Sequence, residues 1–230
     1  MNKPYLSIII PVLNEIDQLE GLLTALRKNM IFENEIIFVD GGSSDGSFEF
    51  LKIKGAYSVI QTKKGRARQQ NSGAEMASSD FLYFIHADTV PPYGFDKTIH
   101  QAFKQGYKAG SFRLKFLSSH ISLQLVSFAS RFNNRFCRGG DQSLFIKKTF
   151  FESIKGFNEE YLVCEDGELI DRIYKKTLFC VLPQEVKTSA RRYEDNGVFR
   201  LQFHFFMIHL LRHVGKSPYM LHQYYSHFVK

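Results

Sequence analysis

The sequence predicts an α/β protein in which helices cover both faces of a mostly parallel sheet. Segments with strand and helix patterns alternate four times before residue 90. The strand segments are apolar throughout, which is typical of parallel strands that are buried on both faces. The 230 residues, 44% of them hydrophobic, can bury one large core, so we expect one domain and no second independent one.

The expected elements follow one another closely. Four strands are predicted, at 6–10, 35–40, 56–62 and 80–86, and three helices between them, at 16–29, 47–53 and 65–78. The first helix has apolar residues at the spacing of one helix face. Each strand precedes a polar turn, and the four turns are PVLNE, DGGSSDGS, KKGRARQQ and HADTVPP. Ligands of open parallel sheets bind beyond the carboxyl ends of the strands, so we expect these turns to line one crevice.

The charge balance and the absence of certain motifs narrow the possible classes of protein. Lys and Arg outnumber Asp and Glu by 30 to 23, which favours an anionic partner: a phosphorylated substrate, a nucleic acid or an anionic membrane. The chain has no helix-turn-helix, RRM or zinc-finger spacing, so we expect no nucleic-acid partner. It also lacks G-x-G-x-x-G after the first strand and the P-loop pattern, which argues against a dinucleotide oxidoreductase and a P-loop NTPase.

The cysteine pattern and the apolar segments bear on location. Three widely spaced cysteines without C-x-x-C indicate neither a disulfide framework nor a zinc ribbon and fit a reducing cytoplasm. The N-terminal apolar run is interrupted by Pro11, Asn14 and Glu15 and is interpreted as a buried strand rather than a signal peptide. Because no 18-residue apolar window exists, we expect no membrane span.

The stretch YFIHADTVPP, residues 83–92, contains candidate metal ligands. His86 and Asp88 flank one alanine at the end of a predicted strand, where alternate side chains point to the same side. The simpler alternative is the polar end of a strand with a structural histidine. The residues alone leave the choice between these two interpretations open.

Six motifs in order resemble family 2 glycosyltransferases of the GT-A fold. They are SIIIPVLNE, FVDGGSSDGS, KGRARQQNSGAEMASSDFLYFIHADT, GGDQSLFI, GFNE followed by CEDGELIDRI, and SARRYEDNG. The resemblance covers residues 5–200, with particular similarity to a short bacterial subgroup whose metal motif reads His-Ala-Asp. It implies a Rossmann-like GT-A nucleotide-diphospho-sugar transferase fold and transfer of a sugar from a nucleotide-diphosphate donor to an acceptor.

The resemblance also implies a donor site. The family's Asp-x-Asp metal motif falls on His86 and Asp88, with Ala87 between them, and would bind Mn²⁺ or Mg²⁺ and through it the donor diphosphate. The first Asp of that motif is His here, which changes the charge of the site by one. The remaining donor-binding candidates are Pro11, Asn14, Glu15, Asp40, Gly42, Arg68, Asn71 and Arg192. Without the resemblance, Gly42 is as well explained by a flexible turn, and the basic residues from Lys63 to Arg68 by a solvated helix start.

Acceptor-side candidates follow residue 93. In the family the Asp of the Glu-Asp pair is the usual base that takes the acceptor proton, which makes Asp166 the candidate, with Glu165 beside it; an ordinary acidic helix start is the alternative. Asp141 is a candidate beside the reacting sugar, or a turn residue. Arg192 stands where the family's Q-x-x-R-W element has its Arg, although the Gln and Trp are missing and Arg191 is a rival.

The expected organisation is a GT-A domain over 1–198, with a donor half at 1–92 and an acceptor half at 93–198, followed by a C-terminal segment at 199–230. Within that segment, residues 199–214 have helical apolar spacing. The helix could pack on the core, lie on an anionic membrane at the inner face, or form a homodimer interface. Acceptors in the family are sugars that are often lipid-linked. A zinc pair at His209 and His213 is disfavoured because the intervening Glu of H-E-x-x-H is absent.

We therefore expect a cytoplasmic, metal-dependent, inverting glycosyltransferase that uses a nucleotide sugar. Two alternatives remain open. A nucleotidyltransferase on a similar fold would also bind nucleotide and metal, although that class usually opens with a loop rich in glycine and arginine rather than PVLNE. A catalytically inactive relative that binds nucleotide sugars would explain the altered metal motif.

Overall fold

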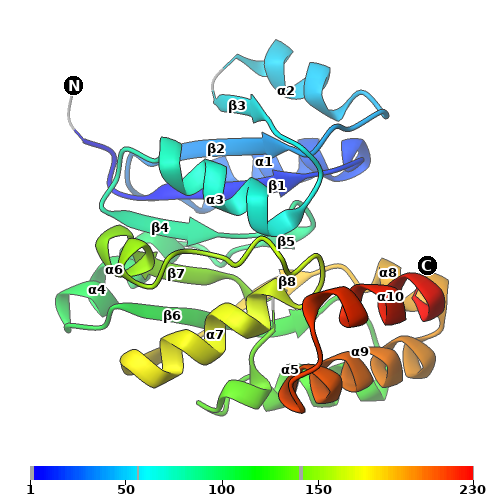
Figure 1. The fold of residues 1–230 in the computed structure, drawn as a ribbon. Coiled ribbons are helices and arrows are strands. Elements are labelled where there is room, and N and C mark those ends of the chain that lie inside the picture. Colours follow the sequence, from blue (N-terminus) through cyan, green and yellow to red (C-terminus); the bar gives the residue numbers. More distant parts are fainter. Residues whose placement is uncertain (1–2, 56, 140–141, 230) are drawn as a thin grey trace.

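The computed structural model describes residues 3–55, 57–139 and 142–229, which form one mixed α/β fold (Figure 1). Its sheet has the strand order β3-β2-β1-β4-β7-β6-β8-β5. The strands are β1 (Ser7–Val12), β2 (Glu35–Asp40), β3 (Ser58–Gln61), β4 (Phe81–Phe84), β5 (Thr89–Val90), β6 (Ala109–Phe116), β7 (Leu144–Lys147) and β8 (Phe179–Thr188). The helices are α1 (Ile16–Asn29), α2 (Ser47–Lys54), α3 (Arg66–Met76), α4 (Phe95–Lys104), α5 (Ile121–Ala129), the short 3₁₀ helix η1 (Arg135–Cys137), α6 (Lys148–Ser153), α7 (Glu165–Lys176), α8 (Arg191–Asn196), α9 (Val198–His213) and α10 (Pro218–Phe228).

The predicted parallel sheet is confirmed for the first half of the chain. Strands β1, β2, β3 and β4 pair in parallel, joined by helical crossovers. The second half is mixed, because β7 runs antiparallel between β4 and β6 while β6 pairs in parallel with β8. Four of the seven described pairings are parallel, so the sheet is mostly parallel as expected.

The apolar character of the central strands has a direct structural cause. Successive side chains of β1 point to opposite faces, and both faces are covered. Ile8 and Ile10 pack in the core beneath α1 and α4, whereas Ile9 packs in a second core beneath α3, α6 and α7. All three are fully buried, which is why this strand has no polar face.

The chain after β4 differs from the predicted strand over 80–86. Strand β4 ends at Phe84, and Ala87 and Asp88 lie in a turn closed by the Thr89 amide, which donates to the His86 carbonyl at 3.1 Å. Strand β5 then pairs with β8, which lies far away in the sequence. The backbone from His86 to Asp88 is therefore a turn and not the extended strand end that the sequence predicted.

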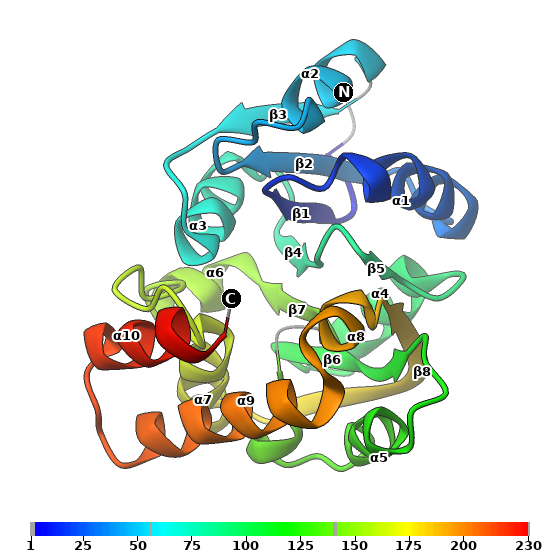
Figure 2. The ribbon, with the colours of Figure 1, turned by 90° about the vertical axis from the view of Figure 1, so that its right-hand side faces the viewer.

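The C-terminal segment is helical and packs on α7. The predicted helix over 199–214 is confirmed as α9, and the aromatic tail forms α10, which folds back along α9 (Figure 2). Arg212 of α9 donates to Asp171 of α7 at 2.7 Å, and the Arg212 side chain is 8% exposed. A Cβ atom at Gly167 would lie 3.2 Å from Arg212 Nη2, so this glycine permits the close approach. No helix within the described residues is long and apolar enough to cross a membrane.

One glycine in the middle of the sheet is predicted to be irreplaceable. In Gly110→Ala the new Cβ would lie 2.3 Å from Phe145 Cζ and 2.4 Å from the Cys180 carbonyl oxygen. Since that oxygen is backbone, the strands must separate, and we expect the free energy of unfolding to fall by about 3 kcal/mol or more in urea denaturation. Gly21→Ala on α1, where nothing lies within 4 Å, is the control and should raise stability by about 1 kcal/mol. Equal stability of Gly110→Ala and the unchanged chain would contradict this account.

Candidate active site

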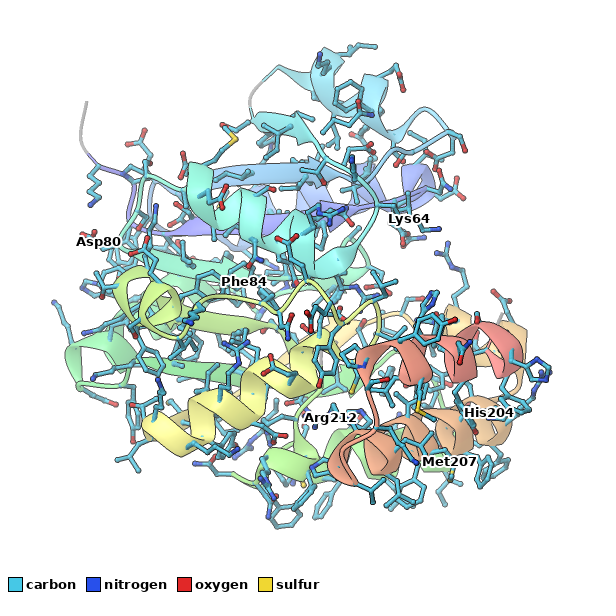
Figure 3. All side chains as sticks on the ribbon, viewed as in Figure 1. Lys64, Asp80, Phe84, His204, Met207 and Arg212 are labelled. Carbon is cyan, nitrogen blue, oxygen red and sulfur yellow. The ribbon has the colours of Figure 1, made fainter. Side chains whose placement is uncertain are left out.

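A cavity of about 1040 Å³ opens at the carboxyl ends of β1, β4, β6 and β8. It is at the upper end of the range of roughly 300–1000 Å³ that small-molecule sites occupy. Its polar lining residues include Glu15, Lys64, Arg66, His86, Asp88, Glu165, Asp166, Arg191 and Arg192. Its apolar and aromatic lining residues include Phe116, Val126, Ala129, Phe136, Leu162, Phe205, Ile208 and Tyr225. Lys64 lies on the connection from β3 to α3, above α10 in the view of Figure 3.

Three of the four predicted turns line this cavity. Pro11 and Glu15 come from the first turn, Lys64 from the third, and Ala87 and Asp88 from the fourth. The first and fourth turns are neighbours because β1 pairs directly with β4. The tertiary structure thus brings residues of the first, third and fourth turns to one cavity.

The second turn does not line the cavity, contrary to expectation. The Asp40 carboxylate is buried and accepts the amides of Gly42 at 2.7 Å and Ser43 at 2.9 Å. Burial alone would raise the pKa of Asp40, but hydrogen bonds from Ser43, Gln61 and Gly42 outweigh it, so the pKa is lowered. Asn14, in a left-handed conformation, accepts the Ser44 amide at 2.8 Å. Asp40 therefore fixes its own turn at Gly42 and Ser43, Asn14 binds the same turn, and none of Asn14, Asp40 and Gly42 lines the cavity.

Asp88, which lines the cavity, is held in place by two threonine hydroxyls. Its Oδ1 accepts the hydroxyl of Thr89 at 3.3 Å and that of Thr188 at 3.5 Å, so β5 and β8 both orient it. Burial raises the pKa of Asp88, while the Thr89 hydrogen bond and the positive charges of Arg66 and Arg191 lower it in part. A partly buried carboxylate with a raised pKa gains from a nearby cation.

Glu15 supplies a second carboxyl group close to Asp88. Burial raises the pKa of Glu15, and the negative charge of Asp88 raises it further. Arg191 lies 3.3 Å from Glu15 Oε2 and partly offsets this effect. Arg191, the rival to Arg192 in the sequence analysis, thus lies beside the acidic pair.

The start of α7 forms the opposite wall. Cys164 in a left-handed conformation precedes Glu165 and Asp166, so both acids lie in the first turn, where the helix dipole favours negative charge. Arg66 Nη1 lies 3.3 Å from Glu165 Oε1 and 3.8 Å from Asp166 Oδ2. The Glu165 side chain is 3% exposed, against 17% for Asp166. Glu165 therefore serves the contact with Arg66, while Asp166 is the more accessible carboxylate.

Arg192 is held by the C-terminal helices. Its guanidinium lies over the rings of Phe205 in α9 and Tyr225 in α10, at 5.2 and 5.5 Å from their centroids, and donates to the Tyr225 hydroxyl. Residues of 199–230, which the sequence analysis set apart as a separate segment, therefore form part of the cavity wall.

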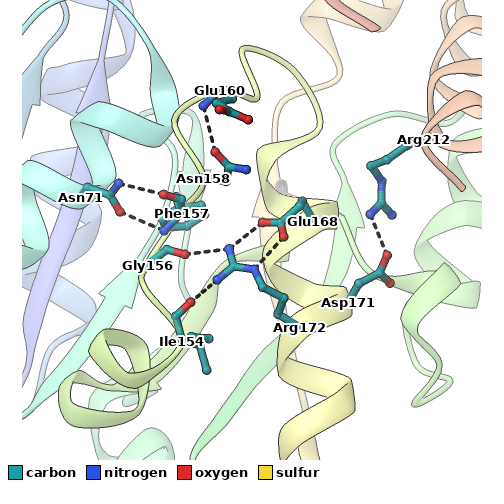
Figure 4. Close-up of polar contacts among 10 residues, drawn as sticks. All are labelled: Asn71, Ile154, Gly156, Phe157, Asn158, Glu160, Glu168, Asp171, Arg172 and Arg212. Atoms are coloured by element: carbon teal, nitrogen blue, oxygen red, sulfur yellow. Dashed lines mark hydrogen bonds and ion pairs between the residues drawn. The ribbon is translucent and has the colours of Figure 1, made fainter. Parts of the chain in front are cut away.

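Arg68 and Asn71 were expected at the donor but lie on the far side of α3 from the cavity. Arg68 Nε donates to Glu159 at 3.0 Å. Asn71 makes two hydrogen bonds with the Phe157 backbone, at 3.0 and 2.9 Å (Figure 4). Both side chains hold the loop that leads to α7. They lie two and five positions beyond Arg66, which at about 100° per residue directs them away from the face on which Arg66 reaches the acids.

The remaining sequence candidate, Asp141, lies outside the described residues. Its neighbour Gln142 lines the cavity and donates to the Cys137 carbonyl at 2.6 Å.

Residues that sequence reasoning passed over include Phe205, Ile208, His222 and Tyr225. Their spacing of three residues within each helix was the available signal, but it could not reveal what the helices face.

The described residues of the cavity offer a divalent cation only part of a ligand set. Among residues 3–55, 57–139 and 142–229, no group of three or more His, Cys, Asp or Glu side chains could hold a metal alone. Mg²⁺ in phosphate-binding sites commonly takes one or two carboxylates and completes its shell with substrate phosphates and water. Asp88, with Glu15 beside it, provides such a partial set, and Lys64, Arg66 and Arg191 supply positive charge for an anionic ligand.

Solved structures with the same fold bind nucleotides. Staphylococcus aureus TarS 1–349 in complex with UDP superposes with a TM-score of 0.67 at 15% identity, over 85% of this chain and 63% of that one. A mannosyltransferase from Pyrobaculum calidifontis in complex with GDP-Man and Mn²⁺ superposes with a TM-score of 0.68 at 16% identity, over 100% of this chain and 71% of that one. These likenesses establish the GT-A fold.

Sequence comparison points to the same family. Poly-beta-1,6-N-acetyl-D-glucosamine synthase of Staphylococcus aureus is 29% identical over 135 residues, which is 54% of this chain and 33% of that protein. An uncharacterized glycosyltransferase of Haemophilus influenzae is 35% identical over 98 residues, or 38% of either chain. The chain thus spans about a third of the length of these curated relatives. The family model for glycosyl transferase family 2 matches residues 7–154, and the chain therefore belongs to that family.

Proposed function

We propose that this chain transfers a sugar from a nucleoside-diphosphate donor to an acceptor hydroxyl, with inversion and with Mn²⁺ or Mg²⁺. The observation that carries the proposal is the cavity into which two carboxylates from different halves open. Asp88 follows β4, Asp166 begins α7, and Arg66 lies between them. Such a pair can hold a metal-bound diphosphate on one side and accept a proton on the other.

The donor is proposed to lie over β1 and β4. Pro11 and Ala87 form the floor, and Lys64, Arg66 and Arg191 face the diphosphate. Asp88, with Glu15, would hold the divalent cation, which when bound offsets the charge of the departing nucleoside diphosphate. Arg192 is a further phosphate contact, because it lines the same cavity with its guanidinium held between two rings.

The chemistry then needs one proton acceptor. Asp166 takes the proton of the acceptor hydroxyl while the oxygen attacks the anomeric carbon. The bond from that carbon to the diphosphate oxygen breaks on the opposite face, and the electron pair leaves with the nucleoside diphosphate. Glu165, which is buried against Arg66, fixes the start of α7 and does not itself take the proton.

The acceptor is proposed to have an apolar part. Besides its charged groups, the cavity is lined by Val126 and Phe136 from α5 and η1 and by Phe205 and Ile208 from α9. A free sugar would leave this apolar surface in water, whereas a lipid-linked or aryl-linked sugar would cover it.

The first test is the release of nucleoside diphosphate from UDP-linked and GDP-linked sugars with Mn²⁺, with and without lipid-linked sugar acceptors. A glycosyltransferase releases UDP or GDP, and release increases with the right acceptor. A nucleotidyltransferase instead forms pyrophosphate from a nucleoside triphosphate and a sugar phosphate. Binding of donor without any release would identify an inactive relative.

Asp88→Asn should uncouple nucleotide binding from metal. The change keeps the size of the side chain but removes the charge, so we expect UDP or GDP affinity to lose its dependence on Mn²⁺ in calorimetry, and kcat to fall by roughly 100-fold or more. Asp17→Asn on the exposed face of α1 is the control and should bind like the unchanged chain. Retained metal dependence in Asp88→Asn would remove this residue from the metal site.

Asp166→Asn should abolish catalysis without weakening donor binding. Loss of a general base lowers kcat by about 10²- to 10⁴-fold, whereas the donor contacts made by Asp88 and Arg191 remain. Turnover and nucleotide affinity are measured on the same preparation, with Asp195→Asn in exposed α8 as control. A parallel loss of affinity would indicate that Asp166 acts on the donor instead.

A further inference from the structure

Helix α9 is apolar on two opposite faces. Its inner face carries the buried Leu201 and Ile208 together with Phe205, which lines the cavity. Its outer face carries a stripe at helical spacing, exposed by 44–68%: Phe199, Phe203, Phe206, Leu210 and Val214. A surface helix normally places polar residues on its outer side, so a second apolar stripe indicates that something covers it.

Helix α5 presents a matching stripe. Ile121 and Leu125 are 72% and 64% exposed, and Phe128, at the next position of the same face, is 51% exposed. The stripe continues past the end of the helix with Phe132 and with Phe136 in η1, at 54% and 66%. The inner residue Leu123 is fully buried. Like α9, this helix exposes large apolar side chains on the side away from the core.

The two stripes form one surface. His120 at the start of α5 contacts Phe199 at the start of α9, with ring centroids 5.0 Å apart. Phe136 after α5 contacts His213 at the end of α9, at 5.1 Å. Figures 1 and 2 both show α5 and α9 at the lower edge of the molecule, away from α2 and β3. We call this surface, formed by the outer sides of α5, η1 and α9, the α5–α9 face.

The segments that form the α5–α9 face carry charge of one sign. Neither 111–139 nor 196–229 contains an Asp or Glu. Arg131 and Arg135 lie over the rings of Phe128 and Phe136, at 4.3 and 4.7 Å from their centroids, with their aliphatic stems along the apolar surface. Lys216 is exposed just beyond α9. Aromatic side chains bordered by cations are the pattern of segments that bind at anionic bilayer surfaces.

We propose that the α5–α9 face binds an anionic phospholipid bilayer, with its aromatic side chains at the level of the headgroups. A second copy of the chain is the other occupant to consider. A two-fold interface would bring the same face of both copies together and would place their cations, Arg131 among them, against one another. The segments of the face contain no acid, and Asp171 of α7, which lies 3.9 Å from Arg135, is already paired with Arg212 at 2.7 Å. A lipid surface supplies the missing negative charge, so charge complementarity favours the bilayer.

This location would also bring the cavity to the membrane. The same three elements that carry the exposed stripes also contribute lining residues to the cavity: Ile208, which is buried, and the partly exposed Val126 and Phe136. The inference goes beyond the proposed function and does not depend on it, because it rests on the outer faces of the helices.

The test uses the absence of tryptophan from the chain. Phe206→Trp places one indole on the α5–α9 face, and Tyr93→Trp, at a residue that is 72% exposed and lies outside it, is the control. With vesicles of equal parts phosphatidylglycerol and phosphatidylcholine, we expect the emission of Phe206→Trp to shift to shorter wavelength and to be quenched by brominated acyl chains. The emission of Tyr93→Trp should not change.

A second pair of variants separates apolar from electrostatic binding. Phe203→Ser combined with Leu210→Gln should lower partitioning onto these vesicles by about tenfold or more, whereas Ile53→Gln, 84% exposed on α2, should not. Arg131→Gln and Lys216→Gln should each lower it by about fivefold, and pure phosphatidylcholine should bind weakly. Lys28→Gln on α1 is the charge control. Far-UV circular dichroism and thermal unfolding establish that each variant is folded.

Two results would overturn the proposal. One is the absence of vesicle binding by the folded, unchanged chain at low salt. The other is a dimer in sedimentation velocity that Phe203→Ser with Leu210→Gln converts to monomer while vesicle binding is unaffected, since a second copy would then cover the face. The arginine and lysine variants keep the test decisive if the apolar variants fail to fold.

Discussion

The geometry of the cavity depends on the contact between Arg66 and the buried Glu165. Glu165 Oε1 accepts no hydrogen bond from the described residues, and the Arg66 guanidinium at 3.3 Å is the charge that faces it. A buried carboxylate without a cation is costly, so the start of α7 must stay against the start of α3. This constraint fixes Asp166 opposite Asp88 and thereby brings the two halves of the chain to one site.

Helix α3 also holds the loop before α7, through Asn71. Asn71 binds the Phe157 backbone, and Arg172 of α7 donates to Gly156 and Glu168 (Figure 4). Side chains of α3 that face away from the cavity thus set the path of the chain into Glu165. Arg68 and Asn71 can therefore matter for catalysis without touching a ligand. If the loop that they hold moved, Asp166 would move with it.

The C-terminal helices connect the site with the outside of the molecule. Arg212 and Asp171 attach α9 to the helix that begins with Glu165, and Tyr225 of α10 holds Arg192. The inner side of α9 therefore belongs to the cavity, and its outer side to the exposed α5–α9 face. One helix serving both surfaces explains why its sequence is apolar nearly all round.

The sequence alone determined the first half of the fold and the polar turns at its strand ends. Apolar strands in alternation with helices leave few arrangements other than a parallel sheet, and the His-Ala-Asp and Glu-Asp motifs marked Asp88 and Asp166 before any coordinates. The tertiary structure decided which neighbours of these motifs face the cavity. Arg66 reaches Glu165 while Arg68 and Asn71 turn away, because residues on a helix point in directions that depend on its rotation against the sheet. Asp40 likewise accepts hydrogen bonds from its own turn, and Asn14 binds Ser44 of that turn. The antiparallel β7 and the wall formed by α9 and α10 arise from contacts between residues far apart in the chain. Local patterns do not encode such contacts, because they depend on which surfaces the completed core leaves open.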